Sequence, residues 1–130
     1  MESFSGRYLI VFNGEIYNSD DLKIKLSEIK LKGNSDTEVL VNLFAKFGIK
    51  ALNLLEGMFS FVIYDKILNN CIIARDRFGI KPLYFYNSGS SFIFASEILN
   101  KYLHKALSEF PCAEIKIFLF SVRFFLISFS

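Results

Sequence analysis

The sequence of 130 residues is short of several residue types that mark particular classes of protein. It contains two cysteines, Cys71 and Cys112, a single histidine, His104, two prolines and no tryptophan. Two cysteines are too few for a disulfide framework, and their setting shows no metal-ligand spacing. A single histidine argues against a zinc site. The net charge of +2, from 15 basic and 13 acidic side chains, gives no field that would select nucleic acid.

Long hydrophobic runs are also absent. No segment reaches the roughly 18 apolar residues that a membrane-spanning helix needs. The first six residues carry no basic side chain, and the apolar run at 8–12 is too short for the core of a secretory signal. We therefore expect a cytoplasmic chain with no membrane span. The hydrophobic fraction of 52% excludes a disordered chain, and the length suits one domain.

What the sequence does contain is a succession of strand and helix patterns. Apolar runs bounded by turn residues predict strands, and apolar residues at helical spacing predict helices, one of them starting at a Ser35–Glu38 capping box. Several strands look apolar on both faces, so we expect their sheets to be covered on both sides. The predicted strands are 7–13, 58–65, 71–75, 83–86 and 91–95, and the predicted helices are 19–29, 36–47, 49–55 and 96–103.

The character of the sequence changes after His104. The segment from Ile115 to Ser130 is rich in Phe, Leu and Ile but shows neither strand alternation nor a helical stripe. We therefore divide the chain into a domain at 1–103 and an unassigned apolar tail at 104–130.

Two short segments contain polar groups that could carry chemistry. Asn13-Gly14 places a side-chain amide beside a glycine backbone N–H, the donor pair that stabilises an oxyanion in acyl transfer, although Asn-Gly alone favours an ordinary turn. Asp36, within Ser-Asp-Thr-Glu, either sits in the first turn of a capped helix or points outward to take a substrate ammonium. The charged segment 74–84 is either a solvated turn or an interface loop.

Four segments occur in one order: FNGEIYN, NSDTEVL, EGMFSFVIYD and ARDRFGIKPLYFY, with FASEI after them. Together they resemble the glutaminase domain of glutamine-hydrolysing asparagine synthetases, which are class II glutamine amidotransferases of the N-terminal nucleophile hydrolase fold. The resemblance covers about residues 6–103. It implies an α+β fold, a partial αββα sandwich of two antiparallel sheets between helices.

The resemblance also implies roles for individual residues. The Asn13 side chain and the Gly14 N–H would form the oxyanion hole, and Glu15 and Asp36 would hold the α-amino group of glutamine. The segment 75–84 resembles the loop that packs toward the synthetase half, to which ammonia is passed.

The sequence departs from this family at its N-terminus. The family's nucleophile is an N-terminal cysteine, whereas here Met1 is followed by Glu2 and Ser3. The arginine that grips the glutamine carboxylate has no counterpart. We therefore expect a fragment cut at both ends, with no nucleophile and no metal site. No cofactor is expected in this chain, because ATP and Mg²⁺ would belong to a synthetase domain outside these residues.

Three hypotheses about function follow. The first is a fragment of an asparagine synthetase whose glutaminase half supplies ammonia for ATP-dependent amidation of aspartate, inactive by itself. The second is a non-catalytic module that binds glutamine or a partner subunit. The third is a pseudogene product without a stable fold. The expected partners are glutamine, bound weakly or not at all, and a synthetase domain or subunit.

Overall fold

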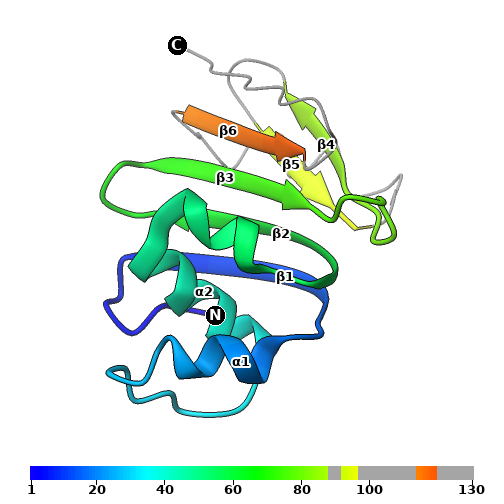
Figure 1. Cartoon of the computed structure of the whole chain (residues 1–130). Helices are drawn as coiled ribbons and strands as arrows, with labels where there is room; N and C mark the ends of the chain where they lie inside the picture. Colours follow the sequence, from blue (N-terminus) through cyan, green and yellow to red (C-terminus); the bar gives the residue numbers. More distant parts are fainter. Residues whose placement is uncertain (88–91, 97–113, 120–130) are drawn as a thin grey trace.

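The computed structural model describes residues 1–87, 92–96 and 114–119 (Figure 1). These residues form six strands, two α-helices and one 3₁₀-helix. In chain order the elements are β1 (Tyr8–Ile16), α1 (Ser19–Ile24), α2 (Asp36–Phe47), η1 (Gly48–Leu54), β2 (Gly57–Asp65), β3 (Asn70–Arg75), β4 (Tyr84–Asn87), β5 (Phe92–Ala95) and β6 (Glu114–Leu119).

The strands form two sheets. The larger sheet has the order β1-β2-β3-β6, in which β2 runs antiparallel to both β1 and β3, and β6 runs parallel to β3. The hairpin of β4 and β5 is the second sheet. Helices α1 and α2 cover one face of the larger sheet (Figure 1), and the hairpin contributes Phe94 to a small cluster with Val62 and Ile73 on the other face. This order of layers confirms the predicted α+β class.

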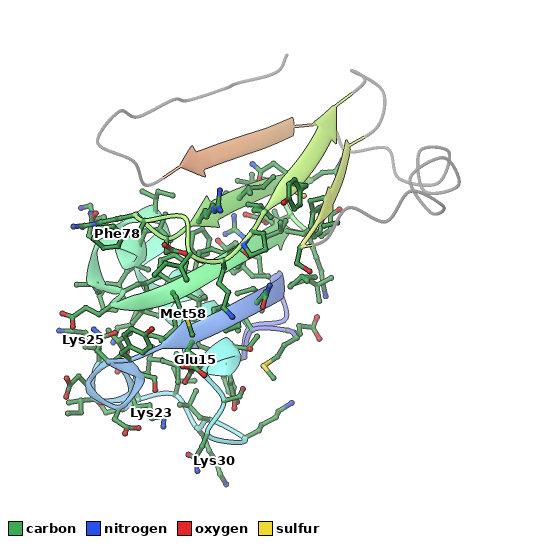
Figure 2. All side chains as sticks on the ribbon, turned by 90° about the vertical axis from the view of Figure 1, so that its right-hand side faces the viewer. Glu15, Lys23, Lys25, Lys30, Met58 and Phe78 are labelled. Carbon is green, nitrogen blue, oxygen red and sulfur yellow. The ribbon has the colours of Figure 1, made fainter. Side chains whose placement is uncertain are left out.

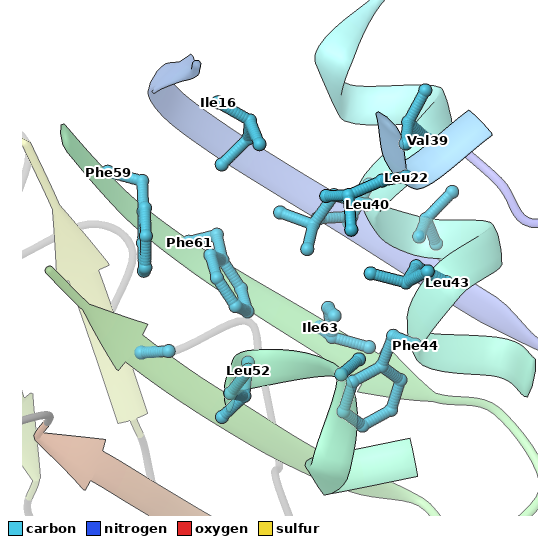
Figure 3. Packing of buried hydrophobic residues seen from close by; sticks show 14 of the residues in the cluster. Ile16, Leu22, Val39, Leu40, Leu43, Phe44, Leu52, Phe59, Phe61 and Ile63 are labelled. Atoms are coloured by element: carbon cyan, nitrogen blue, oxygen red, sulfur yellow. The ribbon is translucent and has the colours of Figure 1, made fainter. Parts of the chain in front are cut away.

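The main core lies between α2 and the larger sheet (Figure 3). Alternate residues of β2 point toward the helices, as the two-residue period of a strand requires. The facing side of α2 is apolar at helical spacing, so both surfaces are removed from water together. Burial of each such side chain contributes roughly 1.5–3 kcal/mol. The residues that meet here include Phe59, Phe61 and Ile63 from β2 and Val39, Leu40, Leu43 and Phe44 from α2.

Helix α2 begins where the sequence predicts, but its capping box is only half formed. The Ser35 hydroxyl oxygen accepts a hydrogen bond from the Glu38 N–H at 3.2 Å. The Glu38 carboxylate turns away from Ser35 and instead accepts from the N–H groups of Lys32 and Gly33 at 2.6 and 2.8 Å. Glu38 therefore ties the loop before α2 to the helix.

Helix α1 is shorter than predicted, since it ends at Ile24 and the Ile24 side chain is 73% exposed. Asn18 does not cap it with its side chain. The Asn18 amide instead donates to the Leu54 carbonyl and accepts from the Glu56 N–H. The start of α1 is thus fastened to the segment between η1 and β2. The helix predicted at 96–103 lies outside the described residues, apart from Ser96.

Strand β6 (Glu114–Leu119) falls within the tail that the sequence left unassigned, and all of it except Glu114 belongs to the segment that shows no strand alternation. The strand pairs with β3 from Asn70 to Arg75. Pairing with β3 satisfies the backbone N–H and C=O groups of β6, and this pairing does not require alternating polar and apolar side chains in the sequence. The domain boundary after residue 103 stays a prediction.

An ion pair joins the start of β1 to the end of β2. The Arg7 guanidinium donates from Nε and Nη2 to the Asp65 carboxylate, with the shortest contact at 2.7 Å. The same carboxylate accepts from the N–H groups of Ile67 and Leu68. The Arg7 hydrogen bond, helped by these two backbone groups, holds the pKa of the buried Asp65 carboxyl below its usual value.

This lowered pKa predicts a pH dependence of stability. The pKa of Asp65 is lower in the folded chain than the value of about 3.9 in the unfolded chain, so its stabilising contribution is complete above that value. We expect this contribution to be lost as the pH falls below about 4. Urea unfolding of the wild type and Asp65→Asn between pH 6 and pH 3 measures it. The variant should be less stable at pH 6 and should lose less stability on acidification; equal losses in both proteins would contradict the assignment.

Candidate functional site

Strand β1 passes straight through Asn13-Gly14, so the strand end predicted at Asn13 is wrong. The register pairs Asn13 with Ser60 and Gly14 with Phe59. Gly14 has φ +147°, and a Cβ atom on it would collide with the Met58 carbonyl oxygen and lie 2.7 Å from the Phe59 Cα. The glycine is needed for the close approach of β2, and not for a turn.

The Gly14 N–H faces the outer edge of the sheet. Hydrogen bonds from Ser3 N to Tyr8 O at 2.9 Å and from Ile10 N to Met1 O at 2.8 Å show that even-numbered residues of β1 turn their backbone groups away from β2. Since this direction repeats every second residue, Gly14 also points outward. In the described part of the chain no hydrogen-bond acceptor occupies this N–H, so it is free to bind a ligand.

Helix α2 brings Asp36 to the same edge. The Asp36 Oδ2 atom accepts from the Ile16 N–H at 2.9 Å, two residues beyond Gly14. Asp36 is the first residue of α2, and its carboxylate therefore docks the helix start onto the end of β1. The structure thus joins two predicted site segments that are separated by about twenty residues.

Asn13 and Glu15 lie on the face of the sheet that the helices leave open, since odd-numbered residues of β1 alternate with the buried Ile10 and Ile16. Asn13 lines a cavity of about 330 Å³ between β1, β2 and the β4–β5 hairpin, with Ser60 and Leu83 among its other lining residues. The Glu15 side chain is exposed and lies close to its pairing partner Met58 (Figure 2). All four predicted site residues therefore gather at the C-terminal half of β1.

The loop after β3 contains groups that reasoning from the sequence missed. The Asp76 carboxylate is buried and accepts backbone N–H groups, so the segment is not a simple solvated turn. The Arg75 guanidinium donates to the carbonyl oxygens of Gly79 and Lys81. Phe78 is 89% exposed at the tip of this loop (Figure 2). The sequence signal for this arrangement is an acidic residue between two arginines before a glycine.

Within residues 1–87, 92–96 and 114–119 no three His, Cys, Asp or Glu side chains come together as a metal site would require. Among the same residues, no helix has the length and apolar character to cross a membrane.

Comparison with known proteins decides which family this arrangement represents. A family profile described as the glutamine amidotransferase domain matches residues 1–118. The chain belongs to the glutamine amidotransferase domain family. The matched range includes Asn13, Gly14, Glu15 and Asp36, and it extends to β6.

The curated relatives of this amidotransferase domain include asparagine synthetases. The chain is 43% identical over 99 residues to asparagine synthetase [glutamine-hydrolyzing] 2 of Bacillus subtilis, a match that covers 76% of this chain and 13% of that protein. It is 40% identical over 102 residues to asparagine synthetase [glutamine-hydrolyzing] of Zea mays, covering 78% of this chain and 16% of that protein. The chain therefore corresponds to less than a fifth of the length of these relatives.

A solved structure gives the same fold. Glutamine phosphoribosylpyrophosphate amidotransferase from B. subtilis superposes with a TM-score of 0.61 at 27% sequence identity, over 75% of this chain and 23% of that chain. The domain accordingly has the amidotransferase fold of the N-terminal nucleophile hydrolase type, of which the described residues form one helical layer and parts of two sheets.

Proposed function

We propose that this chain is the glutamine-recognising part of an asparagine synthetase, in the half that supplies ammonia. The observation that carries this proposal is the free, outward-facing N–H of Gly14 beside the Asn13 amide, with the Asp36 carboxylate fixed two residues further along the same edge. This geometry supports binding of an amide carbonyl and an ammonium group side by side.

In this proposal Asn13 and Gly14 bind the oxygen of the glutamine side-chain amide. Charge develops on that oxygen when a nucleophile attacks the carbonyl carbon, and two N–H donors that are already aimed at it stabilise the tetrahedral intermediate. Loss of one such donor costs about 10²–10³ in rate in acyl-transfer enzymes. Gly14 suits the task because its N–H needs no rearrangement to meet the oxyanion.

Asp36 and Glu15 would bind the α-ammonium group of glutamine. The Asp36 Oδ2 atom is held by the Ile16 N–H, which leaves Oδ1 without a hydrogen-bond partner in the described part of the chain. Glu15 is exposed on the open face next to the same edge. A carboxylate that is already oriented by the backbone forms a stronger charge-assisted bond, because less side-chain freedom is lost on binding.

The ammonia would serve the ATP-dependent amidation of aspartate, by analogy with the B. subtilis and Z. mays relatives, whose names describe glutamine-hydrolysing asparagine synthetases. ATP and Mg²⁺ would bind to a synthetase domain outside these 130 residues. We place the reaction in the cytoplasm. The exposed Phe78, on a loop held from inside by Arg75, supports a contact between this loop and that domain or subunit.

Titration of the ¹⁵N-labelled chain with glutamine tests the proposal. We expect the Gly14 amide signal to move with an affinity of millimolar or weaker, since no arginine has been placed on the substrate carboxylate. Asp36→Asn should weaken binding about tenfold, because hydrogen bonds to charged groups contribute about 1.5–3 kcal/mol.

Two controls make the titration specific. Asp20→Asn changes an exposed carboxylate that pairs with Lys23 on α1, and it should leave the affinity unchanged. N-acetylglutamine has no ammonium group and should not move the Gly14 signal. A Gly14 amide that does not respond to glutamine, or responds equally to both ligands, would contradict the proposed site.

A further inference from the structure

The Asp76 carboxylate follows β3 directly and is 5% exposed. Its Oδ1 atom accepts from the N–H groups of Phe78 and Ile80 at 3.1 and 3.0 Å, and Oδ2 accepts from Lys81 and Phe59 at 3.1 and 3.3 Å. Burial acts to raise the pKa of Asp76, but the backbone N–H groups outweigh it and the pKa lies below its usual value. The group is therefore a carboxylate at neutral pH, and its four bonds are charge-assisted.

One of these four bonds leaves the loop and reaches β2. Phe59 donates its N–H to the Asp76 carboxylate, and its carbonyl oxygen accepts from the Asp76 N–H at 2.8 Å. The preceding pair of the β2–β3 ladder is Ser60 with Arg75, so Phe59 and Asp76 form the next pair. The backbone carbonyl of Asp76 is turned away, where it accepts from Gly79 N–H at 3.1 Å. The side-chain carboxylate thus replaces the missing backbone acceptor of this pair.

Phe59 is also the residue that lies against Gly14. The register pairs the two, and a Cβ atom on Gly14 would lie 2.7 Å from the Phe59 Cα. Because the Gly14 N–H points to the outer edge, this pair is not hydrogen-bonded across the ladder. The direction of the Gly14 N–H therefore depends on packing against Phe59 and on the neighbouring pairs of the ladder. Phe59 in turn is held from its other side by Asp76.

We propose that Asp76 is a positioning residue for the Gly14 N–H, acting through Phe59; this inference rests on the function proposed above. Asp76 contacts neither Gly14 nor the place of the substrate. Its hydrogen bonds extend the β2–β3 ladder by one pair to Phe59, and Phe59 is the residue that lies opposite Gly14. Removal of the carboxylate should therefore disturb the oxyanion donor while the rest of the sheet stays intact.

A matched control exists at the opposite end of β2. Asp65 is also buried, and its carboxylate also accepts backbone N–H groups, from Ile67 and Leu68. Its position in the β1–β2 ladder is opposite Tyr8, far from Gly14 along the same strand. Asp65→Asn therefore removes a comparable anchor at a distance, and Asp76→Asn removes the one that we assign to Gly14.

The experiment compares the full chain and both variants by NMR. In a non-hydrogen-bonded antiparallel pair the Cα atoms are about 4.5 Å apart, which gives a strong Hα–Hα cross-peak between Gly14 and Phe59. We expect Asp76→Asn to weaken this cross-peak at least twofold, to shift the Gly14 amide signal and to reduce its response to glutamine. Asp65→Asn should leave all three unchanged. An unchanged cross-peak and amide signal in a folded Asp76→Asn protein would overturn the inference.

Hydrogen exchange of the wild type decides the matter if Asp76→Asn does not fold. The N–H groups of Ile80 and Phe78 report on the loop, and that of Glu15 reports on the pair next to Gly14. In low urea we expect these three to exchange together, before Leu9 at the other end of β1. Protection of Glu15 after the loop has opened would overturn the inference. Failure of glutamine to move the wild-type Gly14 signal would instead refute the proposed function, and would leave the cross-peak result unaffected.

Discussion

The 130-residue polypeptide should release no ammonia from millimolar glutamine above the rate in buffer. Hydrolysis through a thioester needs a thiolate beside the oxyanion donors. The cysteine among the described residues is Cys71, which is 5% exposed. In the sheet register Cys71 on β3 lies opposite Tyr64 on β2, and Tyr64 lies opposite Leu9 on β1. Leu9 is five residues before Gly14, or roughly 17 Å along an extended strand. A glutamate dehydrogenase assay for ammonia measures the outcome.

Variants of both cysteines make this result interpretable. Cys71→Ala, and Cys112→Ala outside the described residues, should give the same baseline as the wild type, and so should Asn13→Ala. Turnover above buffer that disappears in either cysteine variant would show that a thiol reaches the site. Turnover that persists in both but is lost in Asn13→Ala would show that a different group acts as nucleophile beside the same oxyanion donors.

Elements whose formation depends on neighbouring residues could be predicted from the sequence. Helix α2 begins after Ser35 and ends before Gly48 as predicted, because its cap and its apolar face are local properties. Strands β2 and β3 were predictable for a similar reason, since a short turn joins two apolar runs. Helix α1 was overestimated, because apolar spacing continued beyond the residue at which the backbone leaves the helix.

Features that depend on distant partners could not be predicted in this way. Gly14 belongs to a strand because Phe59 of β2 lies opposite it. The residues around Asn13 contain no signal that identifies this distant partner. The hydrogen bond between Asp36 and the Ile16 N–H likewise requires the packing of α2 on β1. Local reasoning therefore favoured a turn and a plain helix cap. The resemblance in several motifs together supplied the candidate site, because a family pattern contains tertiary information that one segment does not.

Gly14→Ala should destabilise the chain by about 3 kcal/mol or more, a large part of the 5–15 kcal/mol that stabilises a typical domain. The new Cβ would collide with the Met58 carbonyl oxygen and would lie 2.7 Å from the Phe59 Cα. Both are backbone atoms of β2, so no side chain can rotate to make room. The backbone at φ +147° is also unfavourable for alanine. Urea unfolding followed by circular dichroism measures the loss.

Two other glycines separate these causes. Gly48 has φ +59° and ψ −141°, a backbone conformation that alanine rarely adopts, and nothing lies within 4 Å of a new Cβ, so Gly48→Ala should show only the backbone cost, about 1–3 kcal/mol. Gly33 has neither a positive φ nor a contact closer than 3.5 Å, so Gly33→Ala should change stability by less than about 0.5 kcal/mol. The excess of Gly14→Ala over Gly48→Ala measures how tightly β2 packs against Gly14. If the two losses of stability are equal, the close packing of β2 does not hold Gly14 in place. In that case β2 does not fix the direction of the Gly14 N–H.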